Sequence, residues 1–164
     1  MNTGQSLLSI GAFLLLGIII LRINNSVSST DNTVLNSKFD ILGISLAASL
    51  LQEANAKAFD QATAGNSISD INLLTAPGSL NPESGESFSN FNDFDDFNNY
   101  DTTITNLPSA DFHLHCTISY VDPATPSVNV NFKTWDKKIT IYVTSTSTVD
   151  TIKIESVFSY FYFR

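Results

Sequence analysis

The hydrophobic pattern of the chain changes twice between its two ends. Residues 1–21 carry no charged side chain, and an apolar run extends from Leu7 to Ile23. Apolar side chains at spacings of three and four return over residues 34–64, and from residue 111 onward the alternation has a period of two. These periods predict an apolar helix, an amphipathic helix and antiparallel strands, in that order. We therefore expect an α+β fold, in which a long N-terminal helix packs on a C-terminal antiparallel sheet of three to four strands.

The apolar run predicts a helix that water alone cannot accommodate, since its side chains are apolar on every side. Crossing a bilayer takes about 20 such residues, and Leu7 to Ile23 is just long enough. Neither Lys nor Arg precedes the run and no small-x-small site follows it, so it does not match a cleaved secretory signal. We expect a retained helix that anchors the chain in a membrane or packs against copies of itself.

Polar residues divide the chain into an N-terminal segment and a globular domain. Residues 24–33 are poor helix formers, so the helix is expected to thin or break there. Gly65 and Asn66 form a plausible C-terminal stop for the second helix. The expected parts are an apolar helix at 1–33 and a globular domain at 34–164, which comprises a helix at 34–64, a connection at 65–110 and a sheet at 111–164. The helix face expected on the sheet holds Val34, Leu35, Lys38, Ile41, Leu42, Ser45, Leu46, Ser49 and Leu50.

Charge and the missing motifs exclude several functions. The net charge is −8, with 8 Lys and Arg against 16 Asp and Glu, so the chain does not bind nucleic acid by charge. No G-x-S-x-G, H-E-x-x-H, C-x-x-C or phosphate-binding glycine motif occurs, so we expect neither an enzyme nor a cofactor. His113 and His115 share a strand face but lack a visible third metal ligand, and Cys116 has no cysteine partner.

An acidic and aromatic segment lies in the middle of the connection. Its aspartates are weak candidates for calcium, which binds oxygen ligands: Asp93, Asp95, Asp96 and Asp101. The spacing of a calcium-binding EF-hand loop is absent. The interleaved Phe91, Phe94 and Phe97 favour another interpretation, a loop that is docked by its rings and keeps its acids in water.

The order of these parts resembles the type IV pilin superfamily, in which an apolar helix continues as an amphipathic helix before a variable connection and a sheet. In that family a prepilin peptidase cuts after a glycine, and Gly4 before Gln5 fits this outline. The fifth mature residue, usually Glu, would then be Ser9. In a second register Met1 is the mature first residue and Gln5 is the fifth. Cleavage after Gly4 and the Met1 register both remain open.

The resemblance implies a structural subunit that waits in the cytoplasmic membrane as a single-pass precursor. The pilus assembly machinery then adds it to an extracellular homopolymer. The expected assembly core comprises Gln5, Leu7, Leu8, Ile10, Phe13, Leu14, Leu15, Leu16, Ile18, Ile19, Ile20, Leu21 and Arg22. Arg22 is expected either to pair with Asp31, Asp40 or a neighbouring subunit, or to lie at the membrane edge.

Two other functions agree with the same pattern. A pseudopilin, or another minor component of a secretion machine, has the same N-terminal segment but forms no long homopolymer. A membrane-anchored extracytoplasmic binding module would use its first helix as an anchor only.

Overall fold

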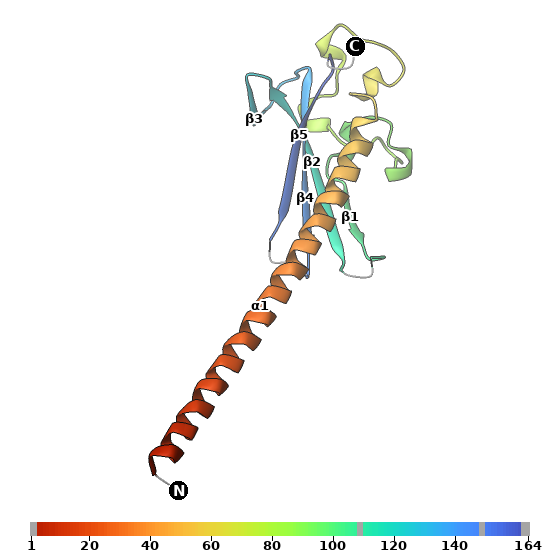
Figure 1. Cartoon of the computed structure of the whole chain (residues 1–164). Coiled ribbons are helices and arrows are strands. Elements are labelled where there is room, and N and C mark those ends of the chain that lie inside the picture. The colour runs from red at the N-terminus through yellow and green to blue at the C-terminus, as the bar shows by residue number, and fades with distance from the viewer. Residues whose placement is uncertain (1–2, 108–109, 148–149, 162–164) are drawn as a thin grey trace. The chain divides into compact units, whose positions relative to one another are not determined.

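The computed structural model describes residues 3–107, 110–147 and 150–161. The chain forms two compact units, an N-terminal unit (Met1–Lys38) and a head (Phe39–Arg164). Figure 1 shows one long helix, several single turns and a sheet. The helices are α1 (Thr3–Asn55) and the 3-10 turns η1 (Gln61–Thr63), η2 (Ile71–Leu73), η3 (Pro77–Ser79), η4 (Phe88–Asn90) and η5 (Asp95–Phe97). The strands are β1 (Asp101–Ile104), β2 (Phe112–Asp122), β3 (Thr125–Val130), β4 (Asp136–Ser145) and β5 (Ile152–Ser159).

The expected break at residues 24–33 does not occur, because these residues are helical throughout. Hydroxyl side chains are accommodated by bonding back to the preceding turn. The Thr30 hydroxyl donates to the Ser26 carbonyl at 2.9 Å, and Ser37 donates to Thr33 at the same distance. A hydroxyl that donates to the carbonyl four residues earlier leaves the backbone hydrogen bonds of the helix in place, so it does not favour a non-helical backbone.

The second half of α1 is shorter than its sequence predicted, since the helix ends at Asn55 and not at residue 64. The following residues pair with a distant segment. The Ala58 N–H donates to the Asn92 carbonyl at 3.1 Å, and the Phe94 N–H donates to the Ala58 carbonyl at 2.9 Å. This long-range bridge uses backbone groups that a further helical turn would need.

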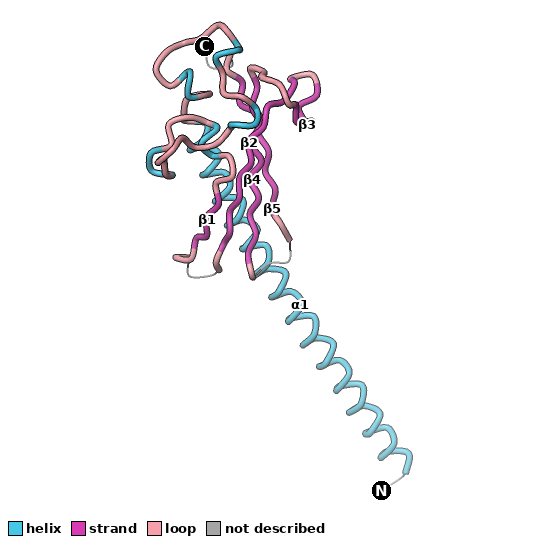
Figure 2. The backbone as a smooth tube through the Cα atoms, turned by 180° about the vertical axis from the view of Figure 1, so that it is seen from behind, coloured by secondary structure: helices cyan, strands magenta, loops and turns pink. Residues whose placement is uncertain are grey.

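The head contains a fully antiparallel sheet of five strands, which corrects the expected three to four. The strand order is β1-β2-β4-β5, and β3 folds back on the end of β2. Figure 2 shows β2 and β4 running side by side through the middle of the sheet. β1 lies within the expected connection; its four residues are too few to reveal a period, and the pairing with β2 defines it.

One face of the sheet packs against the last turns of α1 to form the core of the head. Gly43 permits this close approach, because a Cβ atom there would lie 2.5 Å from Cδ1 of Ile152. The predicted helix face is confirmed only in part: Leu42, Leu46 and Leu50 join the core as expected, whereas Val34, Leu35 and Ile41 are exposed. The fully buried sheet residues include Phe112, Leu114, Cys116, Tyr120, Ile139, Ile141 and Val143.

The acidic loop, residues 83–101, is docked by its aromatic rings as predicted. Phe91, Phe94 and Phe97 are all buried. Phe88 stacks on Tyr100 with ring centroids 4.8 Å apart. The loop is therefore part of the folded head and brings its carboxylates with it into the core.

Candidate functional site

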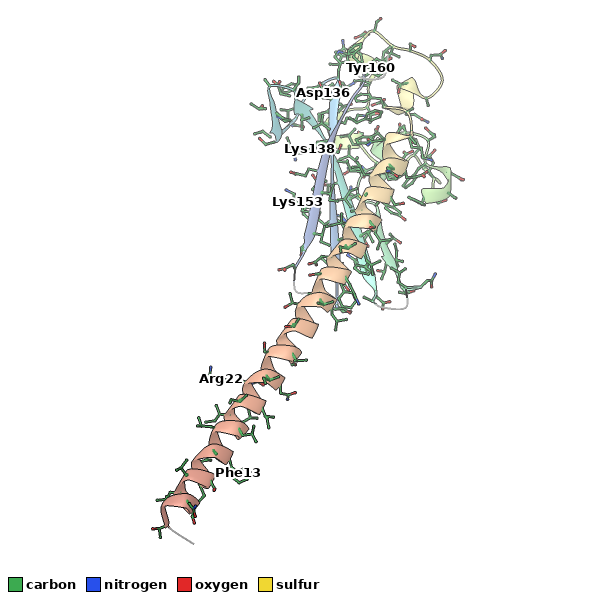
Figure 3. All side chains as sticks on the ribbon, viewed as in Figure 1. Phe13, Arg22, Asp136, Lys138, Lys153 and Tyr160 are labelled. Atoms are coloured by element: carbon green, nitrogen blue, oxygen red, sulfur yellow. The ribbon has the colours of Figure 1, made fainter. Side chains whose placement is uncertain are left out.

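The apolar segment, Leu7–Ile23, presents the largest uncovered hydrophobic surface among the described residues. Its large side chains are between 51% and 77% exposed. Figure 3 shows Phe13 and Arg22 pointing away from the helix axis. The exposed side chains are Leu7, Leu8, Ile10, Phe13, Leu14, Leu15, Leu16, Ile18, Ile19, Ile20, Leu21 and Ile23. Among the described helices, α1 alone is long and apolar enough to cross a membrane, judged by length and composition.

This exposure is energetically unfavourable in water. Burying one Leu or Ile side chain contributes about 1.5–3 kcal/mol, and contiguous apolar patches on soluble monomers rarely exceed a few hundred Å². In the described part of the N-terminal unit nothing covers the segment, since its most apolar window is 0% buried. A bilayer or the helices of other molecules would remove this cost by covering the segment.

The polar residues around the apolar segment are also exposed. Gly4 and Gln5 lie in the first turns of α1, and the Ser9 hydroxyl donates to the Gln5 carbonyl at 3.0 Å. Among the described side chains, Arg22 makes no ion pair with Asp40 or any other carboxylate. The predicted partner Asp31 has a side chain outside the described set.

The acidic loop contradicts the expectation that its acids stay in water. Asp93, Asp95 and Asp96 are each at most 1% exposed. The ammonium of Lys137, itself fully buried, lies 2.6 Å from Oδ1 of Asp95 and 2.7 Å from Oδ2 of Asp60. We call Lys137, Asp60 and Asp95 the lysine cluster.

Backbone and hydroxyl groups hold Asp60 in place. Its Oδ1 accepts from the Ala62 N–H at 3.1 Å and from the Thr75 hydroxyl at 3.1 Å, and its Oδ2 accepts from the Thr75 N–H at 3.0 Å. Burial opposes ionisation, but the charge of Lys137 and these hydrogen bonds outweigh it, so the pKa of Asp60 is lowered. Asp60 is therefore the carboxylate that carries the negative charge opposite Lys137.

The other buried aspartates have raised pKa values. Burial raises the pKa of Asp95 despite the nearby Lys137. Burial, together with repulsion from Asp95 and Asp96, raises the pKa of Asp93 to about 9. Asp93 Oδ1 accepts from the N–H groups of Asp95 and Asp96 at 3.0 and 3.2 Å, while its Oδ2 has no hydrogen-bond partner in the described part of the chain.

The four predicted calcium candidates do not form one site. The Asp101 carboxylate is exposed and lies 2.8 Å from Nε2 of His113 and 3.3 Å from Nδ1 of His115, on the sheet face opposite the core. A hydrogen bond with His113 is the main cause that lowers the pKa of Asp101. Cys116 is a buried core thiol, and burial raises its pKa to about 12.

A different acidic group gathers at the edge of the acidic loop. One carboxylate oxygen of each of Glu83, Glu86 and Asp96 lies within 4.8 Å of the other two. Burial is the main cause that raises the pKa of Glu83 to about 7, with a hydrogen bond to Glu86 and repulsion from Asp96 adding to it. Acidic groups often gather in this way without a metal ion, and we assign none here.

Sequence reasoning missed the lysine cluster. One signal was available, because the alternation Val143, Ile141, Ile139 leads back to Lys137 and places it on the apolar face of β4. No pattern pointed to Asp60, which was expected within a helix. Asp60 lies two residues after Ala58, and the long-range bridge between Ala58 and Asp93 of the acidic loop holds this segment beside Lys137.

Comparison with known proteins gives no further guide to identity: no family model, no curated protein and no solved structure matches the chain.

Proposed function

We propose that this protein is the structural subunit of a pilin-like filament, assembled by bundling the apolar segments of many copies. The observation that supports this most is the apolar segment itself, whose twelve large side chains are all more than half exposed. A head with its own core accompanies it. This combination suits a subunit that hides its helix only when it meets other subunits.

Assembly would follow from the hydrophobic effect. Bundling surrounds the apolar side chains of each subunit with equivalent side chains of its neighbours, so that they stay out of water once the subunit has left the membrane. A head-to-tail contact of this kind does not close on itself and produces a filament. Apart from the adjoining backbone of the helix itself, no described atom lies within 4 Å of the Cβ position at Gly11 or Gly17, so a neighbouring helix could approach closely there.

The proposal is tested by placing a charge in the bundle. Leu14→Asp or Ile18→Asp should abolish filaments, because an unpaired carboxylate in an apolar bundle is costly. Electron microscopy of native material from cells that carry each variant gives the measurement. Asn25→Asp, in the polar part of the same helix, is the matched control and should assemble. Filaments of normal length from Leu14→Asp would exclude the bundle.

A second candidate is a membrane-anchored binding module, favoured by the suitability of α1 for crossing a membrane. In that case the apolar segment contacts lipid only. Site-specific cross-linking from Leu14 or Ile18 in membranes distinguishes the two. Products that contain two or more copies support the filament subunit, whereas products with lipid alone support the anchor. Short complexes without filaments would instead indicate a minor pseudopilin.

A further inference from the structure

The lysine cluster brings a nucleophile and two carboxyl groups together in a site that water does not reach. The side chain of Lys137 is 0% exposed, that of Asp60 is 0% and that of Asp95 is 2%. The Phe59 carbonyl accepts a hydrogen bond from the same ammonium at 2.9 Å. The ammonium also lies 4.7 Å from the centre of the Phe59 ring. The amine is thus fixed in one position.

The charges of the lysine cluster would not cancel if all three of its side chains were ionised. Two carboxylates face one ammonium, and an uncompensated charge in a buried site is expensive. A proton on Asp95 removes the excess, and Asp60 is the better anion because it accepts three further bonds from Ala62 and Thr75. The arrangement is then a neutral acid and a carboxylate on either side of one amine.

We propose that Lys137 and Asp95 form an intramolecular amide bond, which joins β4 covalently to the acidic loop. Nothing in this step requires a second protein or the filament. A nitrogen held 2.6 Å from a carboxyl oxygen is close to the carboxyl carbon, and reacting atoms in a near-attack arrangement lie about 3–3.5 Å apart.

The reaction balances with the groups present. The Lys137 ammonium gives one proton to the Asp60 carboxylate across their 2.7 Å contact. The free amine attacks Cγ of the protonated Asp95, a C–N bond forms and the C–OH bond breaks. The hydroxyl leaves with a second proton from the nitrogen as one water molecule. Asp60 ends protonated, the cluster ends neutral, and exclusion of bulk water opposes the reverse hydrolysis.

The bond would enclose a large part of the head in a covalently closed loop. Lys137 and Asp95 are 42 positions apart in sequence, and the loop between them includes β1, β2 and β3. Such a cross-link restricts the unfolded chain in the way that a disulfide does. It would fasten the acidic loop to the sheet in a chain whose single cysteine cannot form an intrachain disulfide.

Mass spectrometry of the full-length chain, purified in detergent and denatured, tests the bond. Trypsin should release residues 58–133 joined to 134–138, one water molecule lighter than the two peptides together, because an acylated Lys137 is not cleaved. Fragmentation of this product should place the link at Asp95. Separate peptides 58–133 and 134–137 overturn the proposal. A peptide that has lost one water molecule while trypsin still cleaves after Lys137 overturns it as well. A link at Asp60 overturns the assignment of Asp95.

Variants of the cluster distinguish an amide bond from a simple contact between Lys137 and Asp95. Lys137→Arg keeps the positive charge but should give no joined product, and Lys138→Arg, the adjacent matched control, should give it in full. Asp60→Asn removes the proton acceptor and should lower the joined fraction at least tenfold. Equal yields from Asp60→Asn and the unmodified chain would overturn the role of Asp60. If these variants fail to fold, the digest of the unmodified chain still decides whether the bond exists.

Discussion

At the scale of single residues, the most consequential feature is a lysine on the apolar face of β4. Lys137 faces inward in register with Tyr120 on β2 and Phe158 on β5. A buried ammonium is tolerated only with close polar or anionic partners, and the Asp60 carboxylate and the Asp95 carboxyl group provide them. The three residues come from separate segments, so each depends on the others for its place in the core.

Replacing Lys137 should destabilise the head far more than replacing its neighbour. Lys137→Met leaves Asp60 buried without its cation and removes the proposed link to Asp95. Loss of one partner of a buried pair alone costs about 3–5 kcal/mol. Lys138→Met should cost less than about 1 kcal/mol, because the partner Glu155, 3.9 Å away, is 42% exposed and its charge is screened by solvent. Denaturant unfolding of both variants in the same detergent gives the comparison. Equal losses would show that the lysine cluster contributes nothing specific.

Stability should fall as the pH rises from about 5 to 8. Asp93 has a pKa raised from 3.8 to about 9, so the folded chain holds a proton that the unfolded chain releases between these values. The stabilising effect is complete below 3.8 and is lost as the pH increases toward 9, by at most about 1.4 kcal/mol per pH unit for one proton. Glu83 acts in the same direction between 4.5 and about 7. Thermal unfolding at pH 5 and pH 8 measures the difference.

Asp93→Asn should weaken this pH dependence without loss of the fold. The carboxamide oxygen can still accept from the N–H groups of Asp95 and Asp96, and the side chain no longer ionises. We expect the variant to match the unmodified chain at pH 5 and to exceed its melting temperature at pH 8. An unchanged pH dependence would show that Asp93 is ionised in the folded chain.

At the scale of elements, α1 combines two kinds of helix. Its first part is apolar on all sides, whereas its last turns have a single apolar face that packs on the sheet. The sequence identified both parts, but the packing face that it predicted also included Val34, Leu35 and Ile41, which are exposed. The face that the sheet selects runs through Leu42, Leu46 and Leu50, on either side of the close approach at Gly43.

Truncation along α1 tests which face packs. Leu50→Ala removes a side chain that is 7% exposed and should cost about 2–5 kcal/mol, as for other buried leucines. Ile41→Ala removes one that is 64% exposed and should change the stability of the head by less than about 0.5 kcal/mol. Unfolding monitored by the Trp135 fluorescence reports on the head alone. Equal losses from the two variants would show that Ile41 also packs, as the predicted face requires.

At the scale of the whole molecule, the chain is an apolar helical unit and a head with its own core. The two units make opposite demands on their surroundings. The apolar segment of the N-terminal unit calls for apolar cover, because its most apolar window is 0% buried among the described residues, whereas the head buries its own apolar residues. On the proposal made above, other copies provide that cover.

Deletion of residues 1–30 should therefore separate the two properties. We expect a soluble, folded and monomeric head, and no filaments in cells that make only this form. Size-exclusion chromatography with light scattering measures the oligomeric state, and circular dichroism measures the fold. Filaments built from the truncated chain would refute assembly through the apolar segment.

The sequence by itself determined the class of the fold and the existence of an uncovered apolar helix. Those features follow from periodicity and from uninterrupted apolar composition, which are local properties of the chain. The tertiary structure alone decided where α1 ends, that β1 is a strand, and that Asp93, Asp95 and Asp96 are buried. These depend on Ala58 pairing with the acidic loop and on Lys137 meeting Asp60 and Asp95, contacts between residues tens of positions apart. The local sequence pattern does not reveal such contacts, because each of these polar residues would suit an exposed position in water equally well. Only the folded chain removes them from water.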